Sequence, residues 1–498
     1  MTKSYTELSG GKGKSILHRP RRFLSKEIAS SIVRIEINGE PYPVRDIAIN
    51  SFSVDVVDKS VTPFFSPTSE CKIYSSNRSE IFSGICQLER EETVSSGTRY
   101  GFSLSDGYID IEKVRLSFQE EKLLSSANST FTEQIFNKVP ISYVEKLTRL
   151  SFSLKSIELS VNRFHSDREP GPEVDPDRCD ILAEELAKKI RPVWHEFDRY
   201  ANENLHLFTQ SEEIHHAIKI FTERMLTHQL TSCPGIWRSY SKPFGYPGDF
   251  LIMNYIYGNG YEGTDVFSKA IHKISVETRI CEAVRHRKEL LKEIISNELI
   301  KIEGTQASIS ETPSRVLSLG CGGAQEVTEL CVDSKFSQAF GHVEWTLVDQ
   351  EDRALTYAQN NIMRAILTGR SRWRINCLYA SFLQLVSDKR TAAITKDRQH
   401  ILYSSGLFDY LKQNRAKRLT RKLFDQVAPG GILVIANLAS PSDYRWQTDY
   451  LLDWEMIYRT EKEMENLTAD LPHVESAKIV KETKTAAVYF LIVRKSSD

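Results

Sequence analysis

A glycine-rich turn, Gly320-Cys321-Gly322-Gly323, stands between an apolar run at residues 315–319 and a helical pattern that begins near Gln325. Glycine at such a turn lets the backbone bend sharply and approach a ligand closely, because no side chain stands in the way. A second apolar run, residues 343–349, ends in Asp349, whose carboxylate can accept hydrogen bonds from two ribose hydroxyls. Together the two features predict a site for a ligand that contains a ribose.

The turn departs from the glycine pattern of dinucleotide-binding enzymes, because Gln325 stands where their third glycine is expected. Further along, Ala428-Pro429-Gly430-Gly431 precedes the apolar run 432–436, an order typical of methyltransferase domains. On these residues, the chain from 314 to 498 resembles the class I S-adenosylmethionine-dependent methyltransferases. The resemblance implies a doubly wound α/β fold, a seven-stranded sheet whose last strand is antiparallel, and S-adenosylmethionine as the cofactor.

The resemblance also implies how the cofactor is held. The glycines would lie under its methionine and ribose parts, and Asp349 would hold the ribose. Many family members carry an acid two residues before the first glycine, where this chain has Ser318, so Glu326 is the candidate for the missing charge near the methionine amine. Ser381 and Phe382 would lie beside the adenine. The expected cofactor-binding residues are Gly320, Cys321, Gly322, Gly323, Glu326, Asp349, Gln350, Ser381 and Phe382.

Residues 237–250 (WRSYSKPFGYPGDF) gather charged and aromatic side chains in a stretch without regular periodicity. Long irregular loops between helices often carry function, although a generic connecting loop is the alternative. Together with residues 403–410 and 452–460, this stretch resembles the bacterial methyltransferases associated with 3-hydroxypalmitic acid methyl ester biosynthesis, the extracellular-factor type. The likeness covers roughly 180–498 and implies an enzyme that methylates the carboxylate of a fatty-acid-like small molecule.

Methyl transfer to a carboxylate needs no strong base, because the attacking oxygen is already anionic. The enzyme mainly aligns the two reactants, excludes water and orients the carboxylate with a cation. The candidate substrate-binding residues are Arg238, Lys242 and Tyr240, and the candidate catalytic residues are Tyr246, Asp249 and Tyr403. A neutral acceptor would need a base, for which His400 and Asp409 are candidates, although an ordinary strand-end histidine is the simpler interpretation of His400.

The N-terminal part of the chain has a different pattern. Short runs that alternate apolar and polar residues, such as 32–37, 52–56 and 100–104, are separated by turn signals that include Asn38-Gly39. Short strands at this spacing predict a small β-barrel or sandwich, which we place at 19–118.

This part resembles a PilZ domain, a family that binds cyclic di-GMP through an arginine motif and a second motif of the D/N-x-S-x-x-G type. The candidate nucleotide contacts are Arg19, Arg21, Arg22 and Asp46, and His18 stands where the first arginine of the spaced pair belongs. Ala48 and Ser51 replace the serine and the glycine of the second motif. We therefore expect a poor nucleotide receptor and a docking or oligomerisation module.

The segments between barrel and sheet are predicted to be largely helical. Residues 119–178 are helical or mixed and end in a charged, proline-rich linker. Residues 179–313 form a helical substrate cap, with helical patterns over about 181–193, 211–230 and 266–300 and an irregular stretch over 231–263. The predicted architecture is thus multidomain: a flexible segment 1–18, a PilZ-like β-barrel, a linker region, a central helical cap, and an α/β methyltransferase domain over 314–498.

The composition narrows the function classes. Lys plus Arg total 65 and Asp plus Glu total 66, so no global basic field attracts nucleic acid, although residues 1–22 are locally basic. The absence of a long apolar run, of a secretory signal and of metal-ligand spacing among the eight cysteines predicts a cytoplasmic protein without a membrane span or a metal. The expected partner is a small acyl or carboxylate substrate; cyclic di-GMP binding and self-association stay open. The rival function is a cyclic di-GMP-linked signalling receptor or scaffold whose methyltransferase-like domain binds without catalysing.

Overall fold

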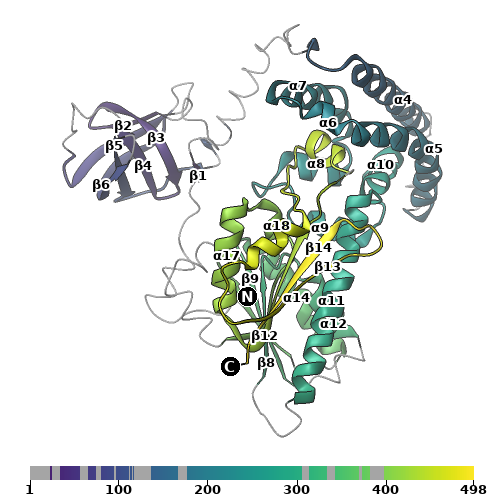
Figure 1. Cartoon of the computed structure of the whole chain (residues 1–498). Helices are drawn as coiled ribbons and strands as arrows, with labels where there is room; N and C mark the ends of the chain where they lie inside the picture. Colours follow the sequence, from purple (N-terminus) through teal and green to yellow (C-terminus); the bar gives the residue numbers. More distant parts are fainter. Residues whose placement is uncertain are drawn as a thin grey trace. The chain divides into compact units, whose positions relative to one another are not determined.

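The structure is a computed structural model (Figure 1), and it describes residues 23–24, 34–56, 65–74, 80–94, 97–111, 113–114, 116, 136–166, 176–305, 313–333, 342–369, 373–381, 398–442 and 444–497. Several predicted features lie outside the described residues, namely the segment 1–18, Arg19, Arg21, Arg22 and Phe382. The chain divides into two compact units, His18–Glu133 on the one hand and Gln134–Asp498 with Met1–Leu17 on the other.

The smaller unit contains a closed antiparallel β-barrel. Its strands are β1 (Phe23–Leu24), β2 (Arg34–Ile37), β3 (Glu40–Ala48), β4 (Ser51–Val56), β5 (Thr68–Tyr74), β6 (Glu80–Val94) and β7 (Gly97–Leu104). The strands β3-β2-β5-β6-β7-β4 form a ring that closes because β4 also pairs with β3, and β1 pairs with β3 as well. The barrel core includes Ile35, Phe52, Ile73 and Phe102. The small barrel predicted from the alternating runs is confirmed.

The helical region belongs to the larger unit. Its helices are α4 (Ile141–Ser166), α5 (Pro176–Glu203), α6 (Leu205–Phe208), α7 (Glu212–Thr222), η1 (Glu223–Thr227), η2 (His228–Leu230), α8 (Pro234–Ser241), α9 (Phe250–Gly258), α10 (Val266–Val276) and α11 (Arg279–Thr305). The single helical pattern expected over 266–300 is thus two helices. None of the helices in the described part of the chain is long and apolar enough to cross a membrane.

The prediction that 231–263 is wholly irregular is wrong, because this stretch contains α8 and α9. Pro234 begins α8 in the first turn, where a missing backbone N–H costs nothing. Asp249 caps α9, since its carboxylate accepts hydrogen bonds from Leu251 N and Ile252 N. Both helices are short, so they leave only a weak periodic signal in the sequence.

The C-terminal part is a seven-stranded mixed sheet. Its strands are β8 (Ser314–Leu319), β9 (Val343–Asp349), β10 (Arg374–Tyr379), β11 (Gln399–Ser404), β12 (Val427–Leu438), β13 (Val474–Lys481) and β14 (Val488–Lys495), in the order β10-β9-β8-β11-β12-β14-β13. The strand β14 is antiparallel to both of its neighbours, and the other pairs are parallel. The predicted doubly wound α/β sheet with an antiparallel last strand is therefore confirmed.

Helices connect the strands and cover the sheet. They are α12 (Gln325–Val332), α14 (Asp352–Gly369), η3 (Leu407–Tyr410), α17 (Gln413–Asp425), η4 (Gln447–Leu451), α18 (Glu461–Glu465) and η5 (Asn466–Thr468). Figure 1 shows α17 on one side of the sheet and α11 and α12 on the other. The α17 side holds a large apolar core, to which Leu317, Leu402, Leu433 and Leu423 contribute.

The strand order creates a crevice at the carboxyl ends of the strands. The chain runs from β8 outward through β9 to β10 and then returns to the other side of β8 as β11. Doubly wound sheets bind ligands where the strand order reverses in this way. The glycine turn after β8, Asp349 at the end of β9 and the turn after β11 are therefore brought to one place.

Candidate active site

A cavity of about 480 Å³ lies at this crevice. From the sheet domain it is lined by the turn Gly320–Gln325, by Asp349 and Gln350, and by residues that follow β11. From the helical region it is lined by residues of α9 and α11. The segment 447–456, which follows β12, contributes a further wall. The sheet and the helical region thus build one cavity together.

Asp349 joins the turns after β8 and β9. Its Oδ2 accepts a hydrogen bond from Gly322 N at 2.8 Å, and its Oδ1 accepts one from Glu351 N at 2.9 Å. Burial raises the pKa of Asp349, while the backbone N–H groups of Gly322 and Glu351 oppose that rise. A carboxylate has about four acceptor positions, so acceptor capacity remains for a ligand hydroxyl beyond the backbone hydrogen bonds from Gly322, Gln350 and Glu351.

The glycine turn is tight and lies directly beneath α9. Gly320 and Gly322 have φ angles of 68° and 53°, in the left-handed region that glycine adopts without strain. A Cβ on Gly322 would lie 3.8 Å from Cβ of Phe250, and one on Gly323 would lie 3.3 Å from Oδ1 of Asn254. Two residues of α9, Phe250 and Asn254, therefore pack close to the backbone of the turn.

Glu326 places a buried carboxylate beside the turn. It lies in the first turn of α12, lines the cavity, and its Oε1 accepts a hydrogen bond from the Tyr403 hydroxyl at 2.7 Å. The pKa of Glu326 is raised because the carboxyl group is buried, although the Tyr403 hydrogen bond opposes that rise. Tyr403 itself is fully buried and is absent from the described cavity lining, so its hydroxyl supports Glu326 instead of facing the cavity. Ser318, which stands where many methyltransferases have an acid, lines the cavity too.

Arg238 and Asp249 bind each other. Arg238 Nε lies 2.7 Å from Asp249 Oδ2, and Asp249 is completely buried as the cap of α9. The Arg238 guanidinium also lies over the ring of Phe244, 4.7 Å from its centroid. Neither residue of the pair is among the described residues that line the cavity. The structure thus gives the pair a role in holding the 237–250 segment in place.

The remaining residues of that segment divide into two groups. Lys242 forms an ion pair with Asp453, and the Tyr240 hydroxyl donates to Glu223, so both side chains are engaged away from the cavity lining. Tyr246 and Gly248, by contrast, line the cavity beside the glycine turn. The pKa of Tyr246 is raised by burial and by the nearby carboxylates of Asp349 and Asp249, so its phenol stays protonated.

Arg287 is a cavity residue that the sequence pattern did not single out. It is only 6% exposed, and its Nη1 lies 3.5 Å from Oδ2 of Asp409. Its Nε is buried and has no hydrogen-bond partner. One signal could have revealed it: Arg287 interrupts an apolar stripe of α11 that includes Val284 and Leu291, which lie one helical turn before and after it.

Asp409 lines the cavity directly beside Arg287. From the sequence it was a candidate only as the base for a neutral acceptor. Its Oδ1 accepts a hydrogen bond from Leu438 N at 2.8 Å. Burial raises the pKa of Asp409 to about 6, although the positive charge of Arg287 opposes that rise. Asp409 therefore titrates close to neutral pH.

An apolar compartment adjoins these groups. Ile280, Val284, Leu438, Leu452 and Met456 contribute to it. Trp454 and Tyr410 close one part of the wall, since Trp454 Nε1 donates to the Tyr410 hydroxyl at 3.0 Å.

The other predicted residues fall in different places. Cys321 and Gln350 line the cavity, whereas Ser381, directly after Ala380 of the lining, is outside the described lining. His400 lies near the start of β11, at the opposite end of the strand from the cavity, and its Nδ1 accepts a hydrogen bond from Arg315 N at 2.9 Å. Asp46 lies on β3 of the barrel and is 9% exposed. Within the described ranges, no cluster of side chains could hold a metal ion.

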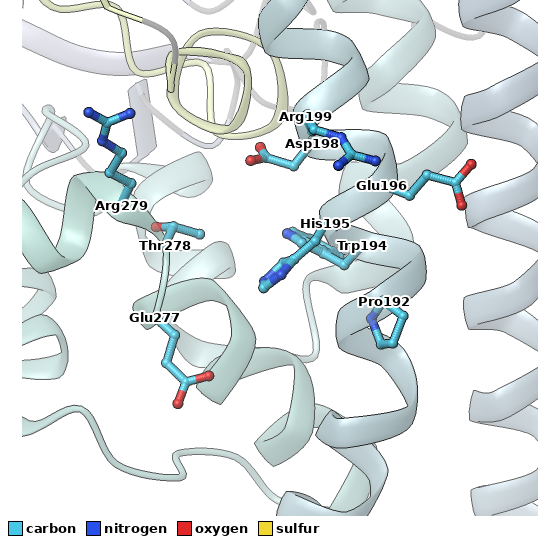
Figure 2. Close-up of a pocket in the computed structure, with 9 residues that line it drawn as sticks. All are labelled: Pro192, Trp194, His195, Glu196, Asp198, Arg199, Glu277, Thr278 and Arg279. Carbon is cyan, nitrogen blue, oxygen red and sulfur yellow. The ribbon is translucent and has the colours of Figure 1, made fainter. Parts of the chain in front are cut away.

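A second depression lies between α5 and the α10–α11 junction, with a volume of about 460 Å³ (Figure 2). Figure 2 shows side chains of both signs along it, with His195 and Asp198 from α5 and Glu277 and Arg279 from the junction. Glu277 is paired with Arg191, and Arg279 donates to the backbone oxygen of Thr485. Glu277 and Arg279 are thus engaged with other parts of the protein, so the crevice at the sheet is the stronger candidate for an active site.

No family model and no curated protein matches the chain in sequence. The solved structures that resemble it include a possible exported protein from Bordetella parapertussis, at 16% identity and a TM-score of 0.41, with 58% of this chain and 99% of that chain covered. A second is magnesium protoporphyrin IX methyltransferase (ChlM) from Synechocystis PCC 6803 with bound SAH, at 13% identity and a TM-score of 0.35, with 52% and 98% covered. A third is N-methyltransferase NodS from Bradyrhizobium japonicum WM9 in complex with S-adenosyl-L-homocysteine, at 15% identity and a TM-score of 0.27, with 41% and 86% covered. Likenesses of this size carry no inference about reaction or ligand.

Proposed function

We propose that the protein is an S-adenosylmethionine-dependent methyltransferase that methylates the carboxylate of a fatty-acid-like small molecule. One observation carries the proposal: a single cavity joins the Gly320–Gly323 turn and Asp349 to an apolar compartment that contains a buried cation, Arg287. The first part suits a nucleoside with an amino-acid tail, and the second suits an aliphatic acid.

The cavity residues fit the cofactor part by part. Asp349 has acceptor positions left for the ribose hydroxyls, and the buried carboxylate of Glu326 suits the ammonium group of the methionine part. Gln350 and Ala380, which line the cavity next to Asp349, would lie beside the adenine. When bound, S-adenosylmethionine supplies a methyl group on a positively charged sulfur, from which an anionic oxygen can take it.

The protein's own part in the reaction is alignment and exclusion of water. Tyr246, Tyr410 and Trp454 place aromatic surface around the crevice, and burial raises the pKa of both tyrosine hydroxyls, so these stay protonated. A carboxylate acceptor needs no proton removed, so no general base is required. A neutral hydroxyl acceptor would instead need a general base. Asp409 could act as that base, because its raised pKa suits proton transfer near neutral pH.

The β-barrel is proposed to act as a docking or regulatory module. Its candidate nucleotide contacts lie mostly outside the described residues, so a role for cyclic di-GMP rests on the sequence resemblance alone. The rival function is a scaffold that binds the cofactor without transferring its methyl group. It predicts binding of S-adenosylhomocysteine without any methylated product.

Two measurements on the full chain test the proposal. Calorimetric titration with S-adenosylhomocysteine should show binding, and methyl-labelled S-adenosylmethionine with a long-chain 3-hydroxy acid should give a labelled product. Mild alkali should release the label as volatile methanol, because a methyl ester is hydrolysed whereas a methyl ether or a methylamine is not. Absence of S-adenosylhomocysteine binding would exclude the cofactor assignment. Binding without transfer to any acid would favour the scaffold.

A further inference from the structure

We infer that Arg287 binds the carboxylate of the methyl acceptor, and that the preceding two turns of α11 hold the acceptor's aliphatic chain. This inference rests on the proposed methyl transfer and names the residue that would select acids as substrates. The sequence had favoured Arg238 and Lys242 for binding the acceptor. In the structure, however, Arg238 is paired with Asp249 and Lys242 with Asp453.

The guanidinium of Arg287 has unused hydrogen-bonding capacity. An arginine carries five N–H donors, and Arg287 uses only some of them. Its guanidinium forms a hydrogen bond with the Tyr257 hydroxyl, but its Nε is buried without a partner, and the Nη1–Asp409 Oδ2 distance of 3.5 Å is long for a hydrogen bond. Asp409 is itself held by Leu438 N through its other oxygen. A buried cation with so few partners is costly to desolvate. An incoming carboxylate would offset that cost, because its two oxygens match the fork of the guanidinium.

The wall beside Arg287 matches an aliphatic chain. Ile280, Val284 and Arg287 follow one another at helical spacing on α11, and all three line the cavity. At a rise of about 1.5 Å per residue, this stripe extends about 10 Å along the helix. Cys281 lies on the same stretch, and Leu438, Leu452 and Met456 line the cavity as well. The stripe is thus apolar over its length and cationic at one end, as an amphiphilic acid requires.

The charges inside the cavity also favour Arg287 as the residue that binds the acceptor. Among the described lining residues the cations are Arg287 and Arg415, and Arg415 is exposed. Of the described lining carboxylates, Glu326 and Asp349 adjoin the glycine turn, where the proposed cofactor would use them, and Asp409 lies beside Arg287. Arg287 is therefore the buried positive charge that remains for an anionic acceptor.

The test compares a long-chain 3-hydroxy acid with the alcohol in which its carboxyl group is replaced by CH2OH. Both are titrated calorimetrically into the full chain, with and without S-adenosylhomocysteine. The wild-type protein should bind the acid about 10- to 100-fold more tightly than the alcohol, the scale of hydrogen bonds to a charged group. Arg287→Gln should remove this preference, and Arg287→Lys should restore part of it. Lys301→Gln, which removes a largely exposed charge from the same helix, should preserve it.

Three results separate the alternatives. An equal affinity of the wild-type protein for acid and alcohol overturns the inference even if every Arg287 variant fails to fold. A loss of S-adenosylhomocysteine affinity in Arg287→Gln, with the preference for acid intact, overturns it as well and assigns the guanidinium to the carboxylate of the cofactor. A preference for acid that depends on Arg287, in a protein that transfers no methyl group, would reject the proposed function and retain Arg287 as the acid anchor.

Discussion

The backbone N–H of Gly322 donates to Asp349 Oδ2 at 2.8 Å, so the acid predicted to hold the ribose also fixes the shape of the glycine turn. We expect Asp349→Ala to lower the affinity for S-adenosylhomocysteine by about 1.5–3 kcal/mol, the scale for losing hydrogen bonds to a charged group. Titration calorimetry measures this change, and circular dichroism checks that the variant folds.

Asp352→Ala is the matched control, since it removes an exposed acid three residues further on, in the first turn of α14. Its affinity should stay close to that of the wild-type protein. If a folded Asp349→Ala variant bound as tightly as this control, Asp349 would have no contact with the ligand.

Arg238 is expected to contribute to stability and not to acceptor binding. Arg238→Gln leaves Asp249 fully buried without its cation, and breaking a buried ion pair in this way costs about 3–5 kcal/mol. Urea unfolding followed by tryptophan fluorescence should show the loss. Lys188→Gln breaks an exposed pair with Glu185, which solvent screens, and should leave the unfolding midpoint almost unchanged. A stable Arg238→Gln variant with a raised KM for the acid would restore the acceptor role that the sequence suggested.

Gly248 is packed against the aromatic wall of the cavity. A Cβ at this position would lie 2.3 Å from Cζ2 of Trp454 and 2.7 Å from the Tyr410 hydroxyl, so Gly248→Ala must displace the pair. We expect the KM for the acceptor to rise, a change in tryptophan fluorescence, and little change in S-adenosylhomocysteine affinity. Gly258→Ala is the control, because a Cβ there meets nothing within 4 Å. Identical acceptor kinetics in the two variants would show that this wall does not contact the acceptor.

Local patterns in the sequence predicted the fold and several residues that line the cavity at the glycine turn. The glycine turn and Asp349 could be found because each directly follows a buried strand, and parallel strands bring such ends together. The acceptor end could not be found in this way. Arg238 and Asp249 look like exposed polar residues in the sequence, yet they form a buried ion pair with each other. Arg287 reaches the cavity only through the packing of α11 over the sheet. Such pairings depend on tertiary contacts that a single sequence does not display.

The barrel is expected to be a weak receptor for cyclic di-GMP. The buried Ala48 offers no hydroxyl, and Ser51 lacks the backbone freedom of glycine. Two lost features at about 1–2 kcal/mol each would weaken binding about 30- to 1000-fold. Titration should therefore show no low-micromolar site. Tight binding that disappears in the double variant Arg21→Ala, Arg22→Ala would instead make the barrel a nucleotide sensor.

The affinity for the acid is expected to depend on pH through Asp409. Its pKa is raised to about 6, so the carboxyl is ionised at pH 7.5 and protonated at pH 5.5. When ionised, it competes with the acceptor carboxylate for Arg287 and repels it. The acid should therefore bind more weakly as the pH rises through about 6, by about tenfold if the interaction shifts the pKa by about one unit. The other charged group near Asp409 is Arg459, which stays protonated, and burial keeps Tyr410 neutral throughout.

Asp409→Asn should make the affinity for the acid independent of pH between about 5.5 and 7.5, because the carboxyl that titrates near pH 6 is gone. The variant keeps an oxygen that can accept the hydrogen bond from Leu438 N, so the fold around it should persist. In the wild-type protein, acid binding at pH 7 should also take up a fraction of a proton, which calorimetry in buffers of different ionisation enthalpy detects. The alcohol analogue should show neither effect, since it brings no charge to Arg287. An acid affinity that is flat with pH in the wild-type protein would mean that Asp409 and the acceptor do not share Arg287.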